Sequence, residues 1–121
     1  MKPIHVLIII TSFISILLAS CSALPTEEPP GVGEKAELGY ATCAPVIAAL
    51  EQYKADKGFY PDALAELVLD YVSAVPTKDE VLDFSYRKTE VSFAFSFHYI
   101  GPGMNTCTYT PENQWQCSGA F

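Results

Sequence analysis

Basic side chains are scarce in this 121-residue chain: seven lysines and arginines stand against fourteen aspartates and glutamates, a formal net charge of −7 at pH 7. Nucleic acids and anionic lipid surfaces attract proteins mainly through Lys and Arg. The charge balance therefore predicts that nucleic acid is not a partner and that electrostatic attraction does not hold the protein to a membrane.

The sequence also lacks the short motifs of common enzymes and cofactor-binding proteins. It contains no glycine-rich phosphate loop, no G-x-S-x-G elbow, no C-x-x-C pair and no metal-ligand spacing. Of its two histidines, His5 lies in the N-terminal apolar stretch, and His98 is expected on the solvent side of a strand without a neighbouring nucleophile. We predict that the protein is not an enzyme and has no catalytic, cofactor-binding or metal-binding residues.

Three carboxylates in one loop, Asp79, Glu80 and Asp83, are the nearest approach to a metal site. Calcium requires six to eight oxygen ligands, which three side chains do not supply by themselves. We interpret this loop as a solvated turn.

The N-terminus does contain a long apolar run that ends at a cysteine. Lys2 gives it a positive start, residues 6–17 are almost uninterruptedly apolar, and the sequence Leu18-Ala19-Ser20-Cys21 follows. This pattern is typical of a bacterial lipoprotein signal, in which small residues precede a cysteine whose thiol carries diacylglycerol before cleavage frees its amine. The alternatives are a plain secretory signal with a chance cysteine or an uncleaved anchor, although the run is short for a spanning helix of about 20 residues.

The lipoprotein interpretation divides the chain into three parts. Residues 1–20 are the signal peptide, residues 21–36 a lipidated flexible tether rich in proline and glycine, and residues 37–121 one globular domain. Acyl chains on Cys21 then attach the protein to the membrane. Because Ser22, and not an aspartate, follows this cysteine, we expect a lipid-anchored protein of the bacterial cell envelope, on the periplasmic face of the outer membrane.

Export would allow the remaining cysteines to form a disulfide. Cys107 and Cys117 are predicted to pair, because they lie on two short strand-like runs joined by residues 111–113. Closing so short a loop stabilises a fold by about 2–3 kcal/mol. Cys43 lies on an apolar helical stripe and is expected to be buried as a small hydrophobic residue, with pairing to another chain as the alternative.

Apolar residues at helical spacing predict a helix over residues 43–57. The stripe consists of Cys43, Val46, Ile47, Leu50 and Tyr53, with Tyr40 just before it. Since Pro45 is tolerated only in a first helical turn, we place the start near Thr42 as the N-cap and the end at Gly58. A shorter helix capped by Asp62, with Leu64, Leu67 and Val68 on its inner side, is expected next.

From residue 84 onward the apolar period changes to two, which predicts strands. Aromatic and polar residues alternate around Phe84 and Tyr86, over residues 91–99, over residues 106–110 and over residues 114–117. Phe93, Phe95 and Phe97 are interpreted as core rather than as a ligand surface. The predicted fold is α+β, with one main helix packed on a small antiparallel sheet of 3–4 strands arranged as a meander, and a C-terminal disulfide.

Residues 48–61 (AALEQYKADKGFYP), with Leu64 and Leu67 after them, resemble the globular half of type II secretion pseudopilins and type IV pilins. In that family a helix ending in an A-L-x-x-Y-x-x-x-x-G-x-Y-P pattern precedes a leucine-containing segment, a proline-rich turn and an antiparallel sheet. The pilin N-terminal apolar helix is missing here, and Cys21 with its tether occupies that place. The calcium loop of the major pseudopilin also has no counterpart, since its D-P-W-G run reads DEVL at residues 79–82.

The resemblance and the lipid signal together predict a non-catalytic envelope protein whose pilin-like domain binds other envelope proteins, as an accessory of a pilus or type II secretion apparatus. The alternative is a periplasmic ligand-binding or inhibitory module on the same scaffold. Trp115 and Tyr109 are the candidate interaction edge, because an indole among polar neighbours either caps the core or serves as a recognition anchor. The oligomeric state does not follow from the sequence.

Overall fold

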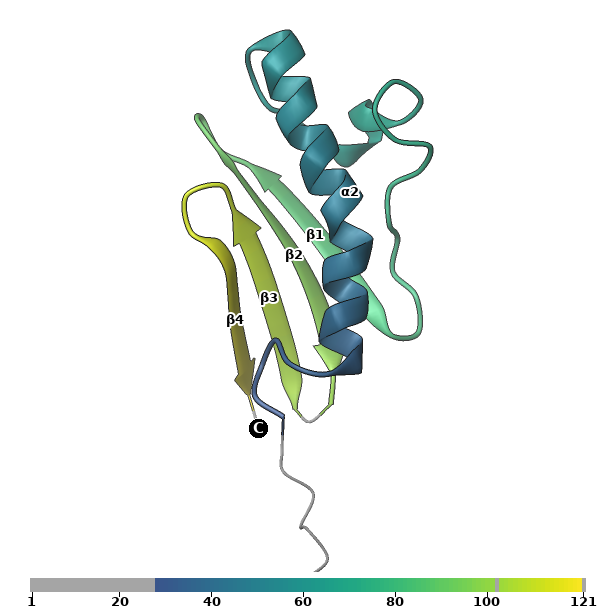
Figure 1. Cartoon of the computed structure of the whole chain (residues 1–121), viewed down its shortest axis with the longest axis vertical. Coiled ribbons are helices and arrows are strands. Elements are labelled where there is room, and N and C mark those ends of the chain that lie inside the picture. Colours follow the sequence, from purple (N-terminus) through teal and green to yellow (C-terminus); the bar gives the residue numbers. More distant parts are fainter. Residues whose placement is uncertain (1–27, 102, 121) are drawn as a thin grey trace, which may run out of the picture.

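One long helix lies across one face of a four-stranded antiparallel sheet in the computed structural model, which describes residues 28–101 and 103–120 (Figure 1). The elements are α2 (Glu34–Lys57), the 3₁₀ helix η1 (Leu64–Leu67), β1 (Leu82–Lys88), β2 (Phe93–Ile100), β3 (Met104–Thr110) and β4 (Gln114–Ala120). The predicted α+β class, with one main helix and an antiparallel meander, is confirmed. Within the described ranges, no helix has the length and apolar character needed to cross a membrane.

Helix α2 is longer at its N-terminus than the sequence predicted. It begins at Glu34, so Pro45 lies in its interior and not in its first turn. Thr42 is not an N-cap, because its hydroxyl donates to the carbonyl of Leu38 within the helix (2.7 Å). The expected end is confirmed: Gly58 adopts a left-handed conformation and its N–H donates to the Lys54 carbonyl.

The reason for the early start is the burial of the added turns. Ala36 is fully buried and Gly39 is buried, on the same helical stripe as Cys43. An interior proline costs about 3 kcal/mol, and packing of both halves of the helix on the sheet offsets this loss. Residues 34–36, expected at the end of the tether, therefore belong to the folded domain, while residues 1–27 lie outside the described part.

The segment after α2 contacts the C-terminal end of β1. The short helix predicted there is a single 3₁₀ turn with Ala63, and not Asp62, at its N-cap; the Ala63 N–H donates to the Glu66 carboxylate. Asp62 instead pairs with Lys88 at the end of β1 (3.0 Å). Tyr86 donates its hydroxyl hydrogen to the carbonyl of Pro61, which fastens this turn to the sheet.

The sheet has the order β1-β2-β3-β4, so each strand pairs with its neighbour in the chain. The register places Phe84 opposite Phe97, Phe97 opposite Cys107 and Cys107 opposite Cys117, all on the side facing α2. Phe93, Phe95 and Phe97 are at most 1% exposed, which confirms that these three rings form the core.

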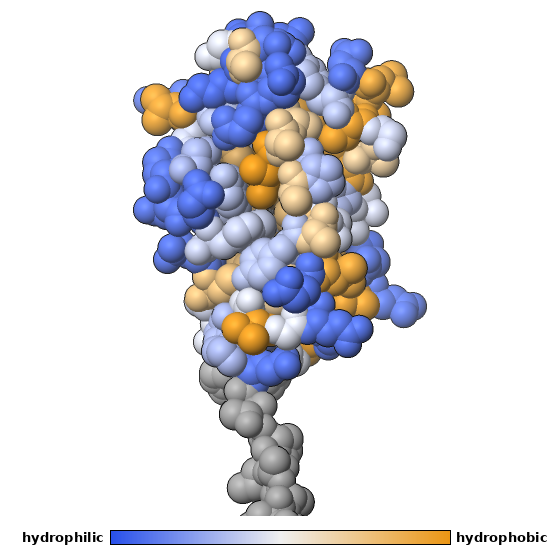
Figure 2. All heavy atoms as spheres, in the orientation of Figure 1, coloured by the Kyte–Doolittle hydropathy of each residue, from blue (hydrophilic) through white to orange (hydrophobic). Residues whose placement is uncertain are grey.

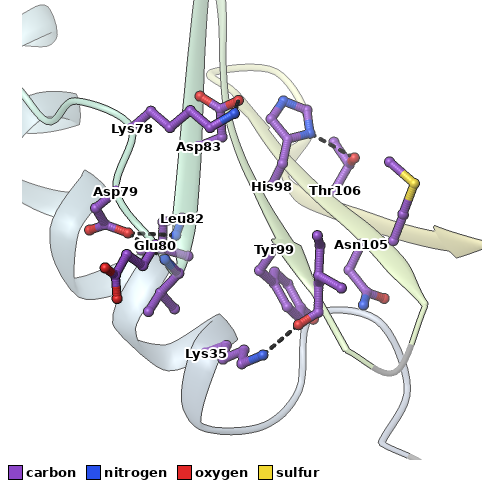
Figure 3. Close-up of a pocket in the computed structure, with 13 residues that line it drawn as sticks. Lys35, Lys78, Asp79, Glu80, Leu82, Asp83, His98, Tyr99, Asn105 and Thr106 are labelled. Carbon is purple, nitrogen blue, oxygen red and sulfur yellow. Dashed lines mark hydrogen bonds and ion pairs between the residues drawn. The ribbon is translucent and has the colours of Figure 1, made fainter.

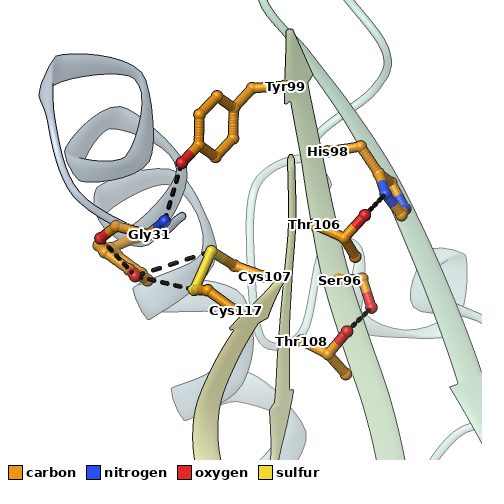
Figure 4. The surroundings of a disulfide bond; sticks show 9 residues. Gly31, Ser96, His98, Tyr99, Thr106, Cys107, Thr108 and Cys117 are labelled. Carbon is orange, nitrogen blue, oxygen red and sulfur yellow. Dashed lines mark hydrogen bonds between the residues drawn. A yellow bond between two sulfur atoms is a disulfide. The ribbon is translucent and has the colours of Figure 1, made fainter. Parts of the chain in front are cut away.

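The opposite face of the sheet is covered by no other element of the described chain and is rich in hydroxyl groups. Ser96 and Thr108 are hydrogen-bonded across β2 and β3 (2.7 Å), and Thr106 lies 2.9 Å from His98 Nδ1. Figure 4 shows these pairs on the side of the sheet away from the disulfide and Tyr99. The sheet therefore has one aromatic, helix-covered face and one polar, open face.

Candidate functional site

The C-terminal edge of the sheet carries the disulfide. Cys107 on β3 and Cys117 on β4 lie directly opposite each other, with their Cα atoms 4.1 Å apart, and their sulfur atoms are bonded. The predicted pairing is confirmed. The bridge locks the last strand onto the sheet beside the N-terminal segment of the domain (Figure 4).

Two tyrosines hold that N-terminal segment against the disulfide. Tyr40 on α2 donates its hydroxyl hydrogen to the carbonyl of Gly31 (2.9 Å), and its oxygen lies 3.2 Å from Cys117 Sγ. The N–H of Gly31 donates to the hydroxyl oxygen of Tyr99 on β2 (2.9 Å). Both backbone groups of Gly31 are thus bound by side chains from two different elements.

Gly31 meets two conditions that another residue would not. Its φ of 83° lies in the left-handed region. A Cβ at this position would lie 2.5 Å from Cys117 Sγ and 2.8 Å from the Tyr40 hydroxyl. The chain can enter the domain past the disulfide only because no side chain is present.

Trp115 closes this edge as part of an aromatic cluster. Its ring centroid lies 5.0 Å from Tyr40, 5.3 Å from Phe97 and 5.4 Å from Tyr109, all in edge-to-face arrangements. The indole is half-buried. The structure therefore brings Trp115 and Tyr109 together, with one side of the indole on the core and the other accessible.

The surroundings of Tyr40 at this edge favour the neutral form of its hydroxyl. Burial, followed by the neighbouring Tyr99 and Glu37, raises the pKa of the Tyr40 hydroxyl above its ordinary value of 10.0. Tyr40 therefore stays protonated at every physiological pH, and its hydrogen bond to Gly31 persists. This edge can therefore bind a partner through the packing of its aromatic rings.

His98 lies on the open face of the sheet and is half-buried, less exposed than the solvent-facing position expected for it. Its Nδ1 lies 2.9 Å from the Thr106 hydroxyl and its Nε2 lies 3.4 Å from the Ser85 hydroxyl. Across residues 28–101 and 103–120 both of its hydrogen-bonding partners are hydroxyls, so no carboxylate orients the imidazole as in a catalytic dyad.

The loop before β1 uses its carboxylates locally. One oxygen of Asp79 accepts the N–H groups of Val81 and Leu82 (both 2.7 Å), and these bonds lower the pKa of the Asp79 carboxyl. Asp83 pairs with Lys78 (3.6 Å). In the described ranges, no group of three or more His, Cys, Asp or Glu side chains could hold a metal ion.

This loop also forms one wall of a cleft of about 490 Å³ that the sequence did not indicate (Figure 3). Its ionisable and polar lining includes Lys35, Lys78, Asp79, Glu80, Asp83, His98, Tyr99 and Asn105. The Lys35 ammonium group donates to the carbonyl of Ile100 at the end of β2. Lys35 was assigned to the tether, so only the fold brings it here.

Of the remaining two cysteines, the structure describes only Cys43. Cys43 is fully buried with a free thiol, as expected for a small hydrophobic residue, and burial raises the pKa of that thiol to about 12. A protonated, inaccessible thiol is not a nucleophile. Cys21 lies outside the described residues.

The outer side of α2 exposes small apolar residues, namely Ala41, Ala44, Pro45 and Ala48. Figure 2 views the molecule from this side and shows pale, weakly apolar residues along the helix, with hydrophilic residues gathered around the far end of the domain. The helix therefore presents a surface with little charge at its centre.

Comparison of the chain with models of known protein families, with curated proteins and with solved structures found no match.

Proposed function

We propose that the protein is a non-catalytic lipoprotein of the bacterial envelope, attached through acylated Cys21, whose pilin-like domain binds other envelope proteins. The observation that carries the proposal is the sequence Leu18-Ala19-Ser20-Cys21 at the end of an apolar run, ahead of a domain built as one helix on an antiparallel meander. The same order of elements is the one that the resemblance to pseudopilins implies. The role that follows is an accessory of a pilus or type II secretion apparatus.

The contact with a partner is assigned to Trp115 and Tyr109. An indole anchored on Tyr40 and Phe97 is rigid, and rigid, half-exposed aromatics contribute most of the binding energy in many protein interfaces. The site lies next to the point where the chain enters the domain, so an anchored protein would present it close to the tether.

Lipid attachment is tested by growing cells with an alkyne-labelled palmitate and following label on the full chain. The native protein should incorporate label, and Cys21→Ser should abolish it. Cys43→Ser is the matched control, because it removes a buried cysteine elsewhere in the same chain and should leave labelling unchanged. Equal labelling of native protein and Cys21→Ser would exclude acylation at this residue.

Partner binding is tested by crosslinked affinity purification of the tagged protein from native envelopes, followed by mass spectrometry. Recovery of pilus or secretion subunits with the native protein, and their loss with Trp115→Ala, would support the assignment. Far-ultraviolet circular dichroism must show that the variant remains folded. A folded Trp115→Ala protein that keeps its partners would rule out this edge.

The alternative of a periplasmic ligand-binding or inhibitory module is favoured by one observation, the cleft beside β1. Its volume of about 490 Å³ lies within the range of small-molecule sites, and it combines ionisable groups with apolar walls. A thermal-shift screen with short peptides and sugars tests it. A ligand that stabilises the native protein but not a Lys78→Ala variant would identify the cleft as the site.

A further inference from the structure

Strand β4 is an unpaired edge whose free backbone groups can be identified. Cys107 and Cys117 form a close pair with a Cα separation of 4.1 Å, the spacing of a non-hydrogen-bonded pair in an antiparallel ladder. The residues between such pairs, Ser118 and Gln116, therefore bond to β3. Trp115, Cys117 and Gly119 direct their N–H and C=O groups away from β3. Residues 30 and 31 lie against Gly119 and Cys117 on the helix side of β4, but no described strand pairs with its outer edge (Figure 1).

This edge lacks the features with which proteins usually prevent strand pairing. The seven residues of β4 (QWQCSGA) include no charged side chain and no proline. The other edge, β1, carries Asp83, Arg87 and Lys88. Charges and prolines on edge strands block pairing with another strand, so β4 is the edge that remains open to it.

The sequence of β4 is complementary to itself in one register. When two copies run antiparallel with Cys117 of each at the centre, Trp115 faces Gly119, Gln116 faces Ser118 and Gln114 faces Ala120. The indole then lies beside a residue without a side chain, so this facing pair causes no clash between side chains. Every facing pair is uncharged, so the net charge of −7 acts against association only through groups outside the strand.

We propose that this chain forms a homodimer by antiparallel pairing of β4 with β4 of a second copy, which joins the two four-stranded sheets into one. The two-fold axis passes between the two Cys117 residues, and the interface is isologous. The proposal stands on the backbone of β4 and does not depend on acylation of Cys21. A contact of seven residues a side is small, so the dimer should be weak in dilute solution and favoured where copies are concentrated on a membrane.

Disulfide trapping in intact cells tests the register. Gln116 and Ser118 would face each other as a non-hydrogen-bonded pair with Cα atoms about 4.5 Å apart, within the range that a disulfide bridges. Full-length Gln116→Cys and Ser118→Cys chains with different tags are co-expressed and treated with a mild oxidant. We expect a crosslinked heterodimer well above the amount that either variant forms alone, since like positions lie about 7–8 Å apart on the diagonal.

Ser85→Cys is the matched control, because Ser85 is exposed on the same face of the sheet but lies on β1. Crosslinking of Ser85→Cys as efficient as that of the 116–118 pair would overturn the proposal. So would the absence of the heterodimer when both chains are present. Crosslinks from residues 116 and 118 to a different protein would also overturn it, and would assign the edge to a strand of that protein.

A series of charged variants tests the same pairing without new cysteines, which could disturb the native disulfide. Gln116→Lys with Ser118→Lys in both copies places like charges opposite each other twice, and co-purification of two tagged copies should fall about tenfold. Gln116→Lys with Ser118→Glu restores opposite charges and should restore co-purification. Ser85→Lys should have no effect. Unchanged co-purification of the doubly lysine-substituted protein would refute the pairing.

Discussion

At two positions of α2, the close contact with the sheet leaves room only for a small residue. A Cβ on Gly39 would lie 2.3 Å from the ring of Phe97, so the helix can approach the sheet only where this glycine stands. One turn later, Cys43 fills a fully buried site with a small side chain. Both positions face the same layer of aromatic rings.

Gly39→Ala is expected to destabilise the protein by about 1–3 kcal/mol, because the added methyl group overpacks the contact with Phe97. Urea unfolding followed by circular dichroism measures the change. The sign of the change in the free energy of unfolding is informative, because alanine normally stabilises a helix by about 1 kcal/mol relative to glycine. Ala41→Gly at an exposed position reports the propensity alone, and a stabilised Gly39→Ala protein would show that the contact is loose.

The Cys43 thiol makes stability fall at high pH. Its pKa is about 12 in the folded protein against an ordinary 9.0, so the unfolded chain loses this proton first as pH rises. The free energy of unfolding should therefore decrease above about pH 9, by at most about 1.4 kcal/mol per pH unit from this group. Cys43→Ala should decrease less steeply between pH 9 and pH 10 in parallel urea titrations. Identical slopes would mean that the thiol ionises freely in the folded state.

At the scale of elements, α2 and β4 meet through the N-terminal segment. Gly31 is bonded by Tyr40 from the helix and by Tyr99 from β2, and it passes over the disulfide that joins β3 to β4. These contacts hold residues that precede the helix predicted from periodicity against the domain. They also couple α2, β2, β3 and β4 at one corner of the domain.

Tyr40→Phe combined with Tyr99→Phe removes both hydroxyls that bond Gly31 while keeping the rings. We expect a loss of about 1–3 kcal/mol, from about 0.5–1.5 kcal/mol for each hydrogen bond. Amide hydrogen exchange of residues 31–36 should become faster. Tyr109→Phe on β3 is the control, and unchanged exchange in the double variant would show that these bonds do not order the segment.

The disulfide should stabilise the domain by about 2–3 kcal/mol, because it closes a short loop between adjacent strands. Cys107→Ala with Cys117→Ala should lower the urea midpoint by a corresponding amount under non-reducing conditions. A reducing agent should lower the stability of the native protein toward that of the variant and leave the variant itself unchanged. Equal stability of both proteins without reductant would mean that β4 is held by its ladder alone.

At the scale of the whole molecule, net charge distinguishes two ways of attaching to a membrane: electrostatic attraction to lipid and anchoring by acyl chains. The chain has a net charge of −7, and one face of its sheet is covered by α2 while the other is open and polar. This charge predicts no electrostatic attraction to anionic lipid, and in the proposed function attachment to a membrane comes from acyl chains.

Washing membranes with about 1 M salt, where the Debye length is only about 3 Å, should leave the native protein in the membrane fraction. A detergent should release it. A peripheral protein held by basic residues serves as the control and should leave with salt. Release of this protein by salt would contradict an acyl anchor and favour attachment through a charged partner.

The sequence predicted those features that depend on neighbours along the chain. Strand periodicity identified all four strands, and the three phenylalanines of β2 form the core as expected. Gly58 ended the helix where its left-handed conformation was predicted. The Cys107–Cys117 pair also followed, since two short runs joined by a tight turn bring their cysteines face to face.

Local patterns could not predict the helix start, the clamp on Gly31 or the cleft. Pro45 suggested a helix start near Thr42, yet burial of Ala36 and Gly39 against the sheet extends the helix to Glu34. The same limit applies to the candidate site: Trp115 and Tyr109 were identified from the periodicity of their two strands, whereas Tyr40 joins them from the helix.

The sequence by itself determined the class of fold, the strands and the disulfide, because these depend on periodicity and spacing over short stretches. Only the tertiary structure decided where α2 begins and what surrounds the disulfide. Gly31 and Tyr99 are 68 residues apart, and Tyr40 and Cys117 are 77 apart. Contacts over such separations form only when the helix packs on the finished sheet, so no local pattern encodes them.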